Sequence, residues 1–461
     1  MPKKKTALTI EERLQQALVP AEEQPYEVPE NWVWVRLGSL LKEIKNGTTI
    51  KQDKSGNGFS VTRIESLQNQ TIDLMRVGTI LETEKIKETD WYKSGDITLS
   101  HINSIEHVGK TALITDAMLP LVHGMNLLRL RFFEIYTPDL FQLYSQTYQY
   151  KNEIRSRINM AVNQVSINQK QLSSLEIPLP PLSEQQRIVE RIEELFAKLD
   201  EAKERLQEVA DSFAVRKAAI LHKAFTGELT KQWRLENGVS DESWEEKKGE
   251  DFFEYVTSGS RGWAKYYSDK GSIFVRMGNL NHGTIELDLS DIQYVELPDQ
   301  VEGQRSKLQK NDILISITAD VGMIGLVRED MDAYINQHVA LARPKNDLYA
   351  EFLAWYFVSD VGLQQMQNKQ RGATKIGLGL QDIRSIILKI PTLPEQHEIV
   401  RLIDDMLARE RSAQQATEQA LASIDLMKKS ILARAFRGEL GTNKASEASA
   451  LELLKQVLAE N

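Results

Sequence analysis

The sequence predicts an α+β protein in which two α+β domains are joined by two long antiparallel coiled-coil helices, with an internal pseudo-two-fold repeat. One long helical segment occurs twice: residues 182–229 and 393–440 match at a constant offset of 211 residues, so that Leu182 corresponds to Leu393. A different segment of short β-like runs precedes each copy. This pattern predicts two similar but non-identical surfaces, which suits the recognition of something bipartite.

The repeat divides the chain into six parts. With 461 residues, of which 41% are apolar and 27% charged, the chain can bury a core in each domain. We expect an N-terminal helix and arm (1–25), a first variable domain (26–176), a first spacer helix (177–230), a second variable domain (231–388), a second spacer helix (389–440) and a C-terminal helix (441–461).

The composition indicates that the protein works in a reducing compartment and that the chain does not insert into a membrane. Cysteine is absent, which excludes disulfides, thiolate nucleophiles and zinc–cysteine sites. The apolar runs are too short to span a bilayer, and the basic start at Met1–Lys5 is not followed by an apolar signal core. We therefore expect a cytoplasmic protein.

The net charge of −9 argues against nucleic acid as a partner, because phosphate binding uses clustered Lys and Arg. The charge is unevenly distributed, however. Residues 25–175 carry about 17 basic and about 16 acidic side chains, whereas residues 240–387 have an acidic excess. Any DNA-facing patch must therefore be local.

Both ends of the chain predict short capped helices. Thr9 and Glu12 have capping-box spacing before an amphipathic segment that stops at Pro20, and Ser449 and Glu452 repeat the spacing. The two terminal segments therefore look like corresponding pieces of a circularly organised repeat, with independent surface helices as the alternative.

The two variable segments predict the same order of elements. In the first, β-like runs occupy residues 32–35, 59–64, 96–99 and 127–130, followed by one helix over 141–157. In the second, the runs at 273–277, 312–316 and 338–341 and a helix over 352–367 correspond to them. Two mixed α+β domains with the same order of elements are indicated.

The long helices show alternating three- and four-residue spacing of apolar side chains, which is typical of a coiled-coil seam. Val209 and Met427 also fall on this spacing. Glu184, Arg187, Glu190, Arg191 and Glu194 are expected on exposed faces, as solvated charge or as a docking surface. The main seam positions are Ile188, Ile192, Leu195, Leu199, Leu206, Phe213 and Ile220 in the first helix, and Ile399, Ile403, Met406, Ile424 and Ile431 in the second.

The residues needed for catalysis are not found. A methyltransferase would require a Gly-rich cofactor loop and an Asn/Asp-Pro-Pro-aromatic site, but Pro180-Pro181 follows Leu179. Gly109-Lys110-Thr111 resembles the end of a phosphate loop, yet Ser104 stands where a glycine is required. The seven histidines lack metal-ligand spacing. We therefore predict no catalytic residues, no metal and no cofactor on this chain.

Binding is the function that remains. Polar and basic side chains that can bond base edges or phosphates concentrate in the loops of the two variable domains, although each one alone is more often a solvated surface group. The candidate DNA-binding residues are Lys51, Arg63, His101, Asn103, Asn126, Arg155, Arg157, Asn163 and Gln164 in the first domain, and Arg261, Trp263, Tyr266, Arg276, Asn279, His282, Asn336, Gln337, His338, Lys369, Arg371 and Lys375 in the second.

The whole pattern resembles the specificity subunit of type I restriction-modification systems (the HsdS family). The resemblance rests on Ile177–Gln186 and Ile390–Gln396, on the two Phe-x-Gly-Glu-Leu endings, and on a variable domain before each. It implies two target-recognition domains that each read half of a split DNA site, with helices that set the spacer and dock two methyltransferase subunits. Restriction/translocase subunits would join them in phage defence. S-adenosylmethionine and ATP with Mg²⁺ would bind the partner subunits.

Two alternatives stay open from the residues. A non-catalytic coiled-coil scaffold that pairs two protein-binding domains explains the seam and the acidity, but not the separate Arg, Asn, Gln and His sets. A fused restriction–methylation enzyme would need the catalytic motifs that the sequence lacks.

Overall fold

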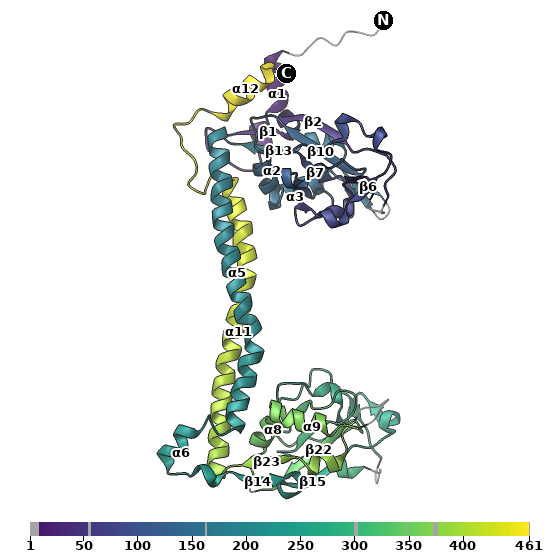
Figure 1. The fold of residues 1–461 in the computed structure, drawn as a ribbon, viewed down its shortest axis with the longest axis vertical. Helices are drawn as coiled ribbons and strands as arrows, with labels where there is room; N and C mark the ends of the chain where they lie inside the picture. Colours follow the sequence, from purple (N-terminus) through teal and green to yellow (C-terminus); the bar gives the residue numbers. More distant parts are fainter. Residues whose placement is uncertain are drawn as a thin grey trace. The chain divides into compact units, whose positions relative to one another are not determined.

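The computed structural model describes residues 9–53, 57–161, 164–298, 303–346, 348–371 and 377–460. The chain forms two compact units, one made of Met1–Arg205 with Ala420–Asn461 and the other of Leu206–Gln419. Figure 1 shows the elements of each unit and the helices that connect them. Among the described residues, no helix has the length and apolarity that crossing a bilayer would need.

Unit 1 contains a four-stranded antiparallel sheet of order β2-β10-β7-β9. Separate pairings join β1 to β13, β3 to β6, β4 to β5, and β11 and β8 to β12. The elements before the first long helix are α1 (Ile10–Ala17), β1 (Val33–Arg36), β2 (Leu41–Asn46), β3 (Phe59–Val61), β4 (Leu67–Gln68), β5 (Thr71–Ile72), β6 (Gly78–Ile80), β7 (Ile97–Ser100), β8 (Ile102–Asn103), β9 (Thr111–Leu113), β10 (Leu127–Phe132), α2 (Pro138–Tyr144), α3 (Tyr148–Arg157), β11 (Asn159–Ala161), β12 (Gln164–Ser166), α4 (Gln169–Ser173) and β13 (Glu176–Leu179).

Unit 2 repeats this sheet as β15-β22-β19-β20, with β14 paired to β23 as β1 is to β13. A second sheet, β16-β18-β17-β21, has no counterpart of the same order among the described residues of unit 1. The elements are α6 (Lys231–Asn237), β14 (Glu245–Lys248), α7 (Gly249–Phe252), β15 (Phe253–Ser258), β16 (Tyr267–Ser268), β17 (Ser272–Val275), β18 (Tyr294–Val295), β19 (Ile313–Ser316), β20 (Ile324–Leu326), β21 (Ala333–Ile335), β22 (Val339–Pro344), α8 (Ala350–Val358), α9 (Asp360–Asn368), α10 (Leu380–Arg384) and β23 (Ile387–Ile390).

The single helix predicted after the strands of each domain is wrong: two helices are present in each. Thr147 is the N-cap of α3, and its hydroxyl accepts a hydrogen bond from the Tyr150 amide (3.1 Å). Ser359 caps α9 in the same way. A capping side chain satisfies an amide that the helix itself leaves unpaired, so it fixes a new helix start.

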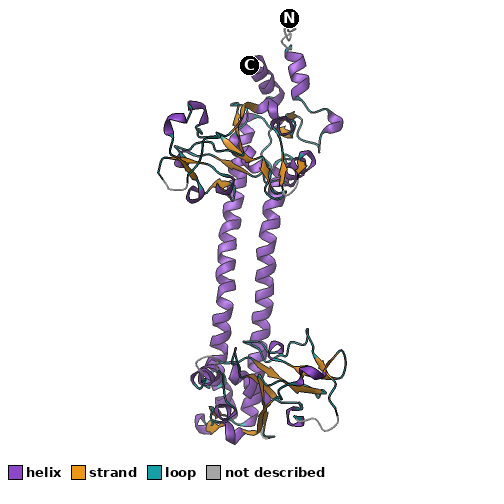
Figure 2. Cartoon of the chain, turned by 90° about the vertical axis from the view of Figure 1, so that its right-hand side faces the viewer, coloured by secondary structure: helices purple, strands orange, loops and turns teal. Residues whose placement is uncertain are grey.

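The two long helices, α5 (Leu182–Phe225) and α11 (Leu393–Ala435), run antiparallel within each unit (Figure 2). In unit 1, Lys203 pairs with Asp425 and Asp200 with Lys428, so the residue numbers rise along one helix as they fall along the other. In unit 2, Arg216 pairs with Glu410. The antiparallel pairing expected from the sequence is thus confirmed.

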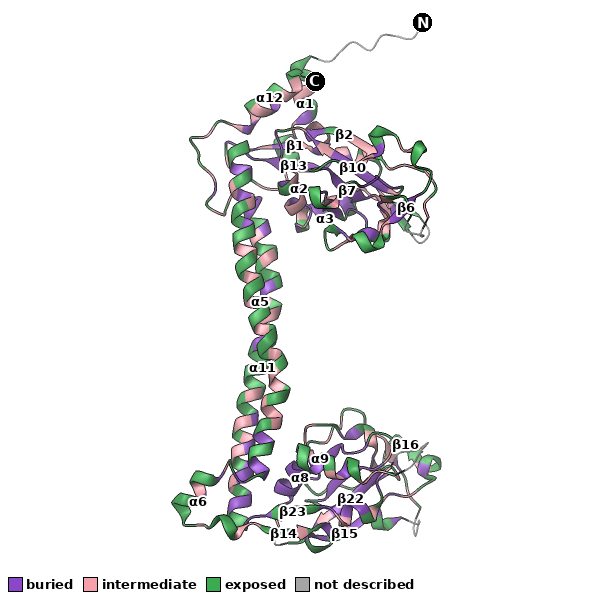
Figure 3. Cartoon of the chain, viewed as in Figure 1, coloured by how far each residue is buried: buried purple, intermediate pink, exposed green. Residues whose placement is uncertain are grey.

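Burial of the helix pair is concentrated where the domains cover it (Figure 3). Ile188 and Ile192 lie in the core of unit 1, and Ile399 and Ile403 in the core of unit 2. Residues 193–219 of α5 are all half-buried or exposed, since two helices alone cannot enclose a seam. Ile220 and Ile424 are buried, and the remaining predicted seam positions are half-buried: Leu195, Leu199, Leu206, Phe213, Met406 and Ile431.

Two positions on the predicted spacing lie outside the seam. Val209 is 41% exposed and Met427 is 50% exposed. On α5 the half-buried position is Ala210, so two successive four-residue steps replace the expected alternation around Leu206. The helix therefore drifts from a strict 3.5-residue period toward the 3.6 residues per turn of a straight helix.

The first and last described helices pack together in unit 1. α1 and α12 (Ala450–Glu460) lie side by side, and Arg13 Nη1 donates to the Leu458 carbonyl (3.2 Å). The Thr9–Glu12 capping box is present, whereas at α12 the Ser449 hydroxyl accepts from the Leu451 amide (3.2 Å). The circular organisation expected from the sequence is therefore confirmed, and independent terminal helices are excluded.

Glu184 and Glu395 occupy equivalent positions in the first turns of α5 and α11, and both are fully buried. Glu184 accepts hydrogen bonds from Trp32 Nε1 (2.7 Å), Thr442 Oγ1 (3.1 Å) and Asn443 Nδ2 (2.8 Å). The expectation that Glu184 lies on an exposed helix face is therefore wrong, because a segment distant in sequence covers it. Arg187 also pairs with Glu447 (2.7 Å).

Glu395 also accepts hydrogen bonds from three side chains in unit 2, with a charged donor in place of one neutral donor. It accepts from Trp244 Nε1 (3.1 Å) and Thr230 Oγ1 (2.7 Å), and its third donor is the charged Arg234 Nη1 (2.7 Å). The Ser/Pro-Glu-Gln signature is thus an anchor. It ties the start of each long helix to the tryptophan directly before β1 or β14, and to the segment after the other long helix.

Candidate nucleic-acid interface

The polar candidates of unit 1 meet at one end of its four-stranded sheet. β7 ends at Ser100, which pairs with Leu127 at the start of β10, so His101 and Asn126 lie beside each other. β12 pairs with β8 and aligns Val165 with Asn103, which brings Gln164 to the same end. The four candidates His101, Asn103, Asn126 and Gln164 therefore come together although they are spread over 64 positions.

His101 suits base recognition electrostatically. Burial lowers the pKa of its imidazole, and a hydrogen bond to the Asn126 backbone opposes the shift. A neutral imidazole has one donor and one acceptor nitrogen, and Nδ1 of His101 is buried without a hydrogen-bond partner among the described residues. Asn126 itself adopts φ of 66°, a left-handed conformation that asparagine tolerates better than most residues.

The corresponding end of the unit 2 sheet carries a different set. Ser316 at the end of β19 pairs with Val339 at the start of β22. The ring of His338 contacts Thr318 Oγ1 through Nδ1 (2.6 Å) and Gln337 through Nε2 (2.9 Å). Asn336 forms an isolated bridge with Ser260, which brings the 259–262 loop to this end.

A hollow of about 610 Å³ opens beside this end of unit 2. Arg261, Tyr266 and Gln337 line it together with Lys265 and Arg305, and no acidic side chain is among the described residues that line it. The acidic excess of this domain therefore lies elsewhere. Sequence reasoning missed Lys265 and Arg305, although the interleaved basic and aromatic residues of 261–266 are a signal for Lys265.

Two candidates of unit 2 are structural instead. Trp263 is 4% exposed and stacks on Phe274, with ring centroids 5.6 Å apart, so it belongs to the core. Asn279 is also 4% exposed, and its amide donates to the carbonyls of Asp288 (2.8 Å) and Asp291 (2.9 Å). Both side chains therefore have a structural role, although Trp263 also lines the hollow.

The remaining candidates divide by their partners. Arg155 and Lys51 are exposed, Lys369 is half-buried, and Asn163 and Lys375 lie outside the described residues. Five others already hold an acidic partner: Arg63 pairs with Glu65, Arg157 with Glu153 and Glu176, Arg276 with Asp291, His282 with Asp320, and Arg371 with Asp382. Only Arg371 among these keeps most of its side chain, 82%, in solvent.

Both units hold the strands behind these loops with the same buried ion pair. Arg131 on β10 donates to both oxygens of Asp96 at 2.7 Å, and Arg343 on β22 donates to both oxygens of Asp312 at 2.7 and 2.8 Å. The two carboxylates are almost completely buried. Bidentate pairing fixes geometry, so the loops start from a rigid frame.

The arrangement defines a class of protein with two similar domains. Each domain has a four-stranded sheet of the same strand order, and one end of each sheet carries its own set of hydrogen-bonding and cationic side chains. The family described as "Type I restriction modification DNA specificity domain" matches residues 29–211 and 241–421. The chain therefore belongs to this family and carries two copies of its domain.

Named relatives agree with this membership. A putative type I restriction enzyme MjaX specificity subunit of Methanocaldococcus jannaschii is 30% identical over 86% of this chain and 92% of its own length. The EcoKI specificity subunit of Escherichia coli is 26% identical over 94% of this chain and 96% of its own. These relatives are specificity subunits, the parts of type I enzymes that do not carry catalysis.

The fold agrees as well. A solved HsdS subunit from Thermoanaerobacter tengcongensis has a TM-score of 0.64 over 91% of this chain and all of its own, at 18% sequence identity. A chain from a structure titled as the type I R-M system has a TM-score of 0.65 over 90% of this chain and all of its own, at 19% identity. At such identities the likeness shows the fold alone.

Proposed function

We propose that this chain selects the DNA target of a type I restriction-modification complex, with each domain contacting one half of a bipartite site. The observation that carries the proposal is the polar end of the four-stranded sheet in each unit. The strand frame is the same in both, whereas the side chains at that end differ. Different hydrogen-bonding groups on equal frames are what two different half-sites require.

We propose that the long helices set the length of the DNA spacer that neither domain reads. α5 has 44 residues and is about 65 Å long at about 1.5 Å per residue. It starts in the core of unit 1 and ends in the core of unit 2. Two readers on a continuous helix would contact blocks of bases at a fixed spacing, as dimeric readers do with half-sites.

The partners are proposed from the same family membership. Two methyltransferase subunits would dock on the exposed helix faces, where Glu190, Arg191 and Glu194 remain in solvent, and restriction/translocase subunits would join them. Those subunits would bind S-adenosylmethionine and ATP with Mg²⁺. This chain would bind no cofactor and would work in the cytoplasm.

Methylation mapping tests the proposal. This chain is produced with its methyltransferase in cells that lack other adenine methylation, and N6-methyladenine is mapped at single-base resolution. One split motif with a fixed spacer is expected, and cells with the methyltransferase alone should show none. If the two proteins co-purified and no motif appeared, the pairing scaffold would be the better account.

A further inference from the structure

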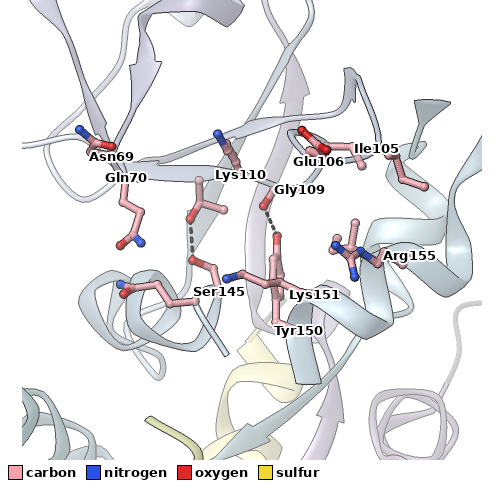
Figure 4. A pocket seen from close by; sticks show the side chains of 14 residues that line it. Asn69, Gln70, Ile105, Glu106, Gly109, Lys110, Ser145, Tyr150, Lys151 and Arg155 are labelled. Atoms are coloured by element: carbon pink, nitrogen blue, oxygen red, sulfur yellow. Dashed lines mark hydrogen bonds between the residues drawn. The ribbon is translucent and has the colours of Figure 1, made fainter. Parts of the chain in front are cut away.

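A cationic cavity of about 280 Å³ lies in unit 1, between the loop before β9, the α3 helix and the turn from β4 to β5 (Figure 4). Lys110, Lys151 and Arg155 line it, and Glu106 is the one acidic side chain among its lining residues. Two hydrogen bonds hold its walls together: Tyr150 Oη donates to the Gly109 carbonyl (2.9 Å), and the hydroxyls of Thr111 and Ser145 lie 2.6 Å apart. We call it the basic cavity.

Within the described residues, the cations of the basic cavity form no ion pair, although Glu106 also lines the cavity. Ion pairs are frequent elsewhere in unit 1, but the described part of the chain offers no acidic partner within 4.0 Å of Lys110, Lys151, Arg155 or the neighbouring Lys429 of α11. Burial lowers the pKa of Lys151, and Lys429, Arg155 and Lys110 lower it further. Four exposed cations therefore lie near one another without an ion-pair partner among the described residues, and their mutual repulsion adds to the lowering of the Lys151 pKa.

The basic cavity adjoins the sheet end that carries the polar candidates. The Ser100 amide donates to the Lys110 carbonyl (2.9 Å), and the Gly109 amide donates back to the Ser100 carbonyl (2.8 Å). The backbone of Lys110 therefore lies next to the end of β7, which His101 directly follows. A duplex whose bases met His101 and Asn126 would bring its phosphates to the flank of this end.

The fold itself does not need these charges. Thr147 and Ser359 start α3 and α9 alike, and Gly109 and Gly322 both pack against those helices. By this alignment Lys110, Lys151 and Arg155 correspond to Met323, Leu363 and Gln367 in unit 2. The same frame is therefore built there from uncharged side chains.

We propose that the basic cavity binds a phosphate group of the DNA backbone next to the half-site read by the first domain. This inference rests on the proposed function, since it assumes that the sheet end faces a duplex. Lysine supplies a point charge for phosphate, and two or three such contacts give affinity without base preference.

The test transfers the residues of unit 2 into unit 1. Lys110→Met with Lys151→Leu is compared with Lys42→Met with Lys93→Met, which removes two exposed lysines at the opposite end of the sheet. Both variants are purified with the methyltransferase. Binding is measured across salt concentrations on a duplex with the mapped site and on a scrambled duplex.

For each lost phosphate contact, affinity should fall about tenfold at ~0.1 M salt and the slope of log affinity against log salt should fall by about 0.9. Both duplexes should show the loss, the methylated motif should be unchanged, and the melting temperature should not fall. The control variant should keep the slope of the unchanged protein.

Three results would overturn the proposal: a slope equal to that of the control, a change in the half-site itself, or loss of the methyltransferase from the complex. The second would mean base readout and the third a protein-docking surface. If the unchanged complex failed to prefer the mapped site over the scrambled duplex, the proposed function would fail instead, and the slope on the scrambled duplex would still test the cavity.

Discussion

The two units share a frame, which is the four-stranded sheet with its Asp–Arg pair, and differ in the loop side chains at one end of that sheet. The sheets β2-β10-β7-β9 and β15-β22-β19-β20 have the same order, and each is braced by a buried Asp–Arg pair. At the polar end, unit 1 presents a histidine after β7, whereas unit 2 presents one before β22. Unit 1 flanks this end with unpaired lysines, and unit 2 flanks it with a hollow lined by Arg261, Lys265 and Arg305.

The difference separates what the fold requires from what recognition requires. The Asp–Arg pair keeps its chemistry between the units, because a buried carboxylate without its partner would be costly. Positions at the polar end change freely. Such freedom lets one architecture read many sequences, since new loops need not disturb the strands that carry them.

The largest difference in stability between the units should appear when the two buried glutamates, Glu184 and Glu395, are changed. Glu395→Gln should lower the free energy of unfolding by about 3–5 kcal/mol, because the nearly buried Arg234 loses its main counter-charge. Glu184→Gln should cost only about 1–3 kcal/mol, since its donors are neutral. Urea denaturation of both variants measures the difference.

Glu439→Gln serves as the control for these two variants. Its side chain is 51% exposed, so it should change stability by less than about 0.5 kcal/mol. If Glu184→Gln cost as much as Glu395→Gln, the charge of Arg234 would not explain the difference between the anchors.

Acid should weaken unit 1 through a histidine that unit 2 lacks. His123 is fully buried, and burial with the nearby Arg129 lowers its pKa to about 3. The unfolded chain takes up a proton near pH ~6.5, so stability is complete above that pH and is lost as the pH falls toward 3. At pH ~5 the loss should be about 2 kcal/mol.

His123→Ile, which places the residue of the equivalent position Ile335, should remove this dependence on pH. The exposed His222→Gln should retain it. Urea midpoints between pH ~5 and ~7.5 give the slopes, and an unchanged slope in His123→Ile would show that another group causes the acid sensitivity.

The most localised effect should come from one loop side chain. Arg261→Ala should weaken binding by about 1–3 kcal/mol and relax base preference in only the half-site of the second domain. Lys310→Ala, an exposed change at the other end of the same sheet, should alter neither. Methylation mapping with binding to single-base variants checks both, and relaxation in the other half would contradict the assignment.

The frame could be predicted from the sequence because its signals repeat. A constant offset of 211 residues and a heptad-like spacing identify the helices, and the same spacing places Ile188 and Ile399 in the seam. Glu184 was misjudged because its cover, Thr442 and Asn443, lies more than 250 positions away. Amphipathic spacing describes only the helix itself and cannot detect such a contact.

The site could be predicted only as a region. Loop residues such as His101 and Gln337 stand out because their side chains can form hydrogen bonds, but Trp263 and Asn279 can do so too and are buried in the fold. Lys110 and Lys151 were missed because they are 41 positions apart and meet only when α3 packs beside the loop before β9. Contacts between elements decide which polar residues are free, and these depend on the tertiary fold.

Exchange of the first domain tests the central claim most directly. Residues 26–175 are replaced by the matching segment of a relative with a different target, and N6-methyladenine is mapped with the methyltransferase present. The account predicts that one half of the motif changes while the spacer and the other half stay the same. A change in both halves, or in the unexchanged half, would contradict two independent readers on one frame.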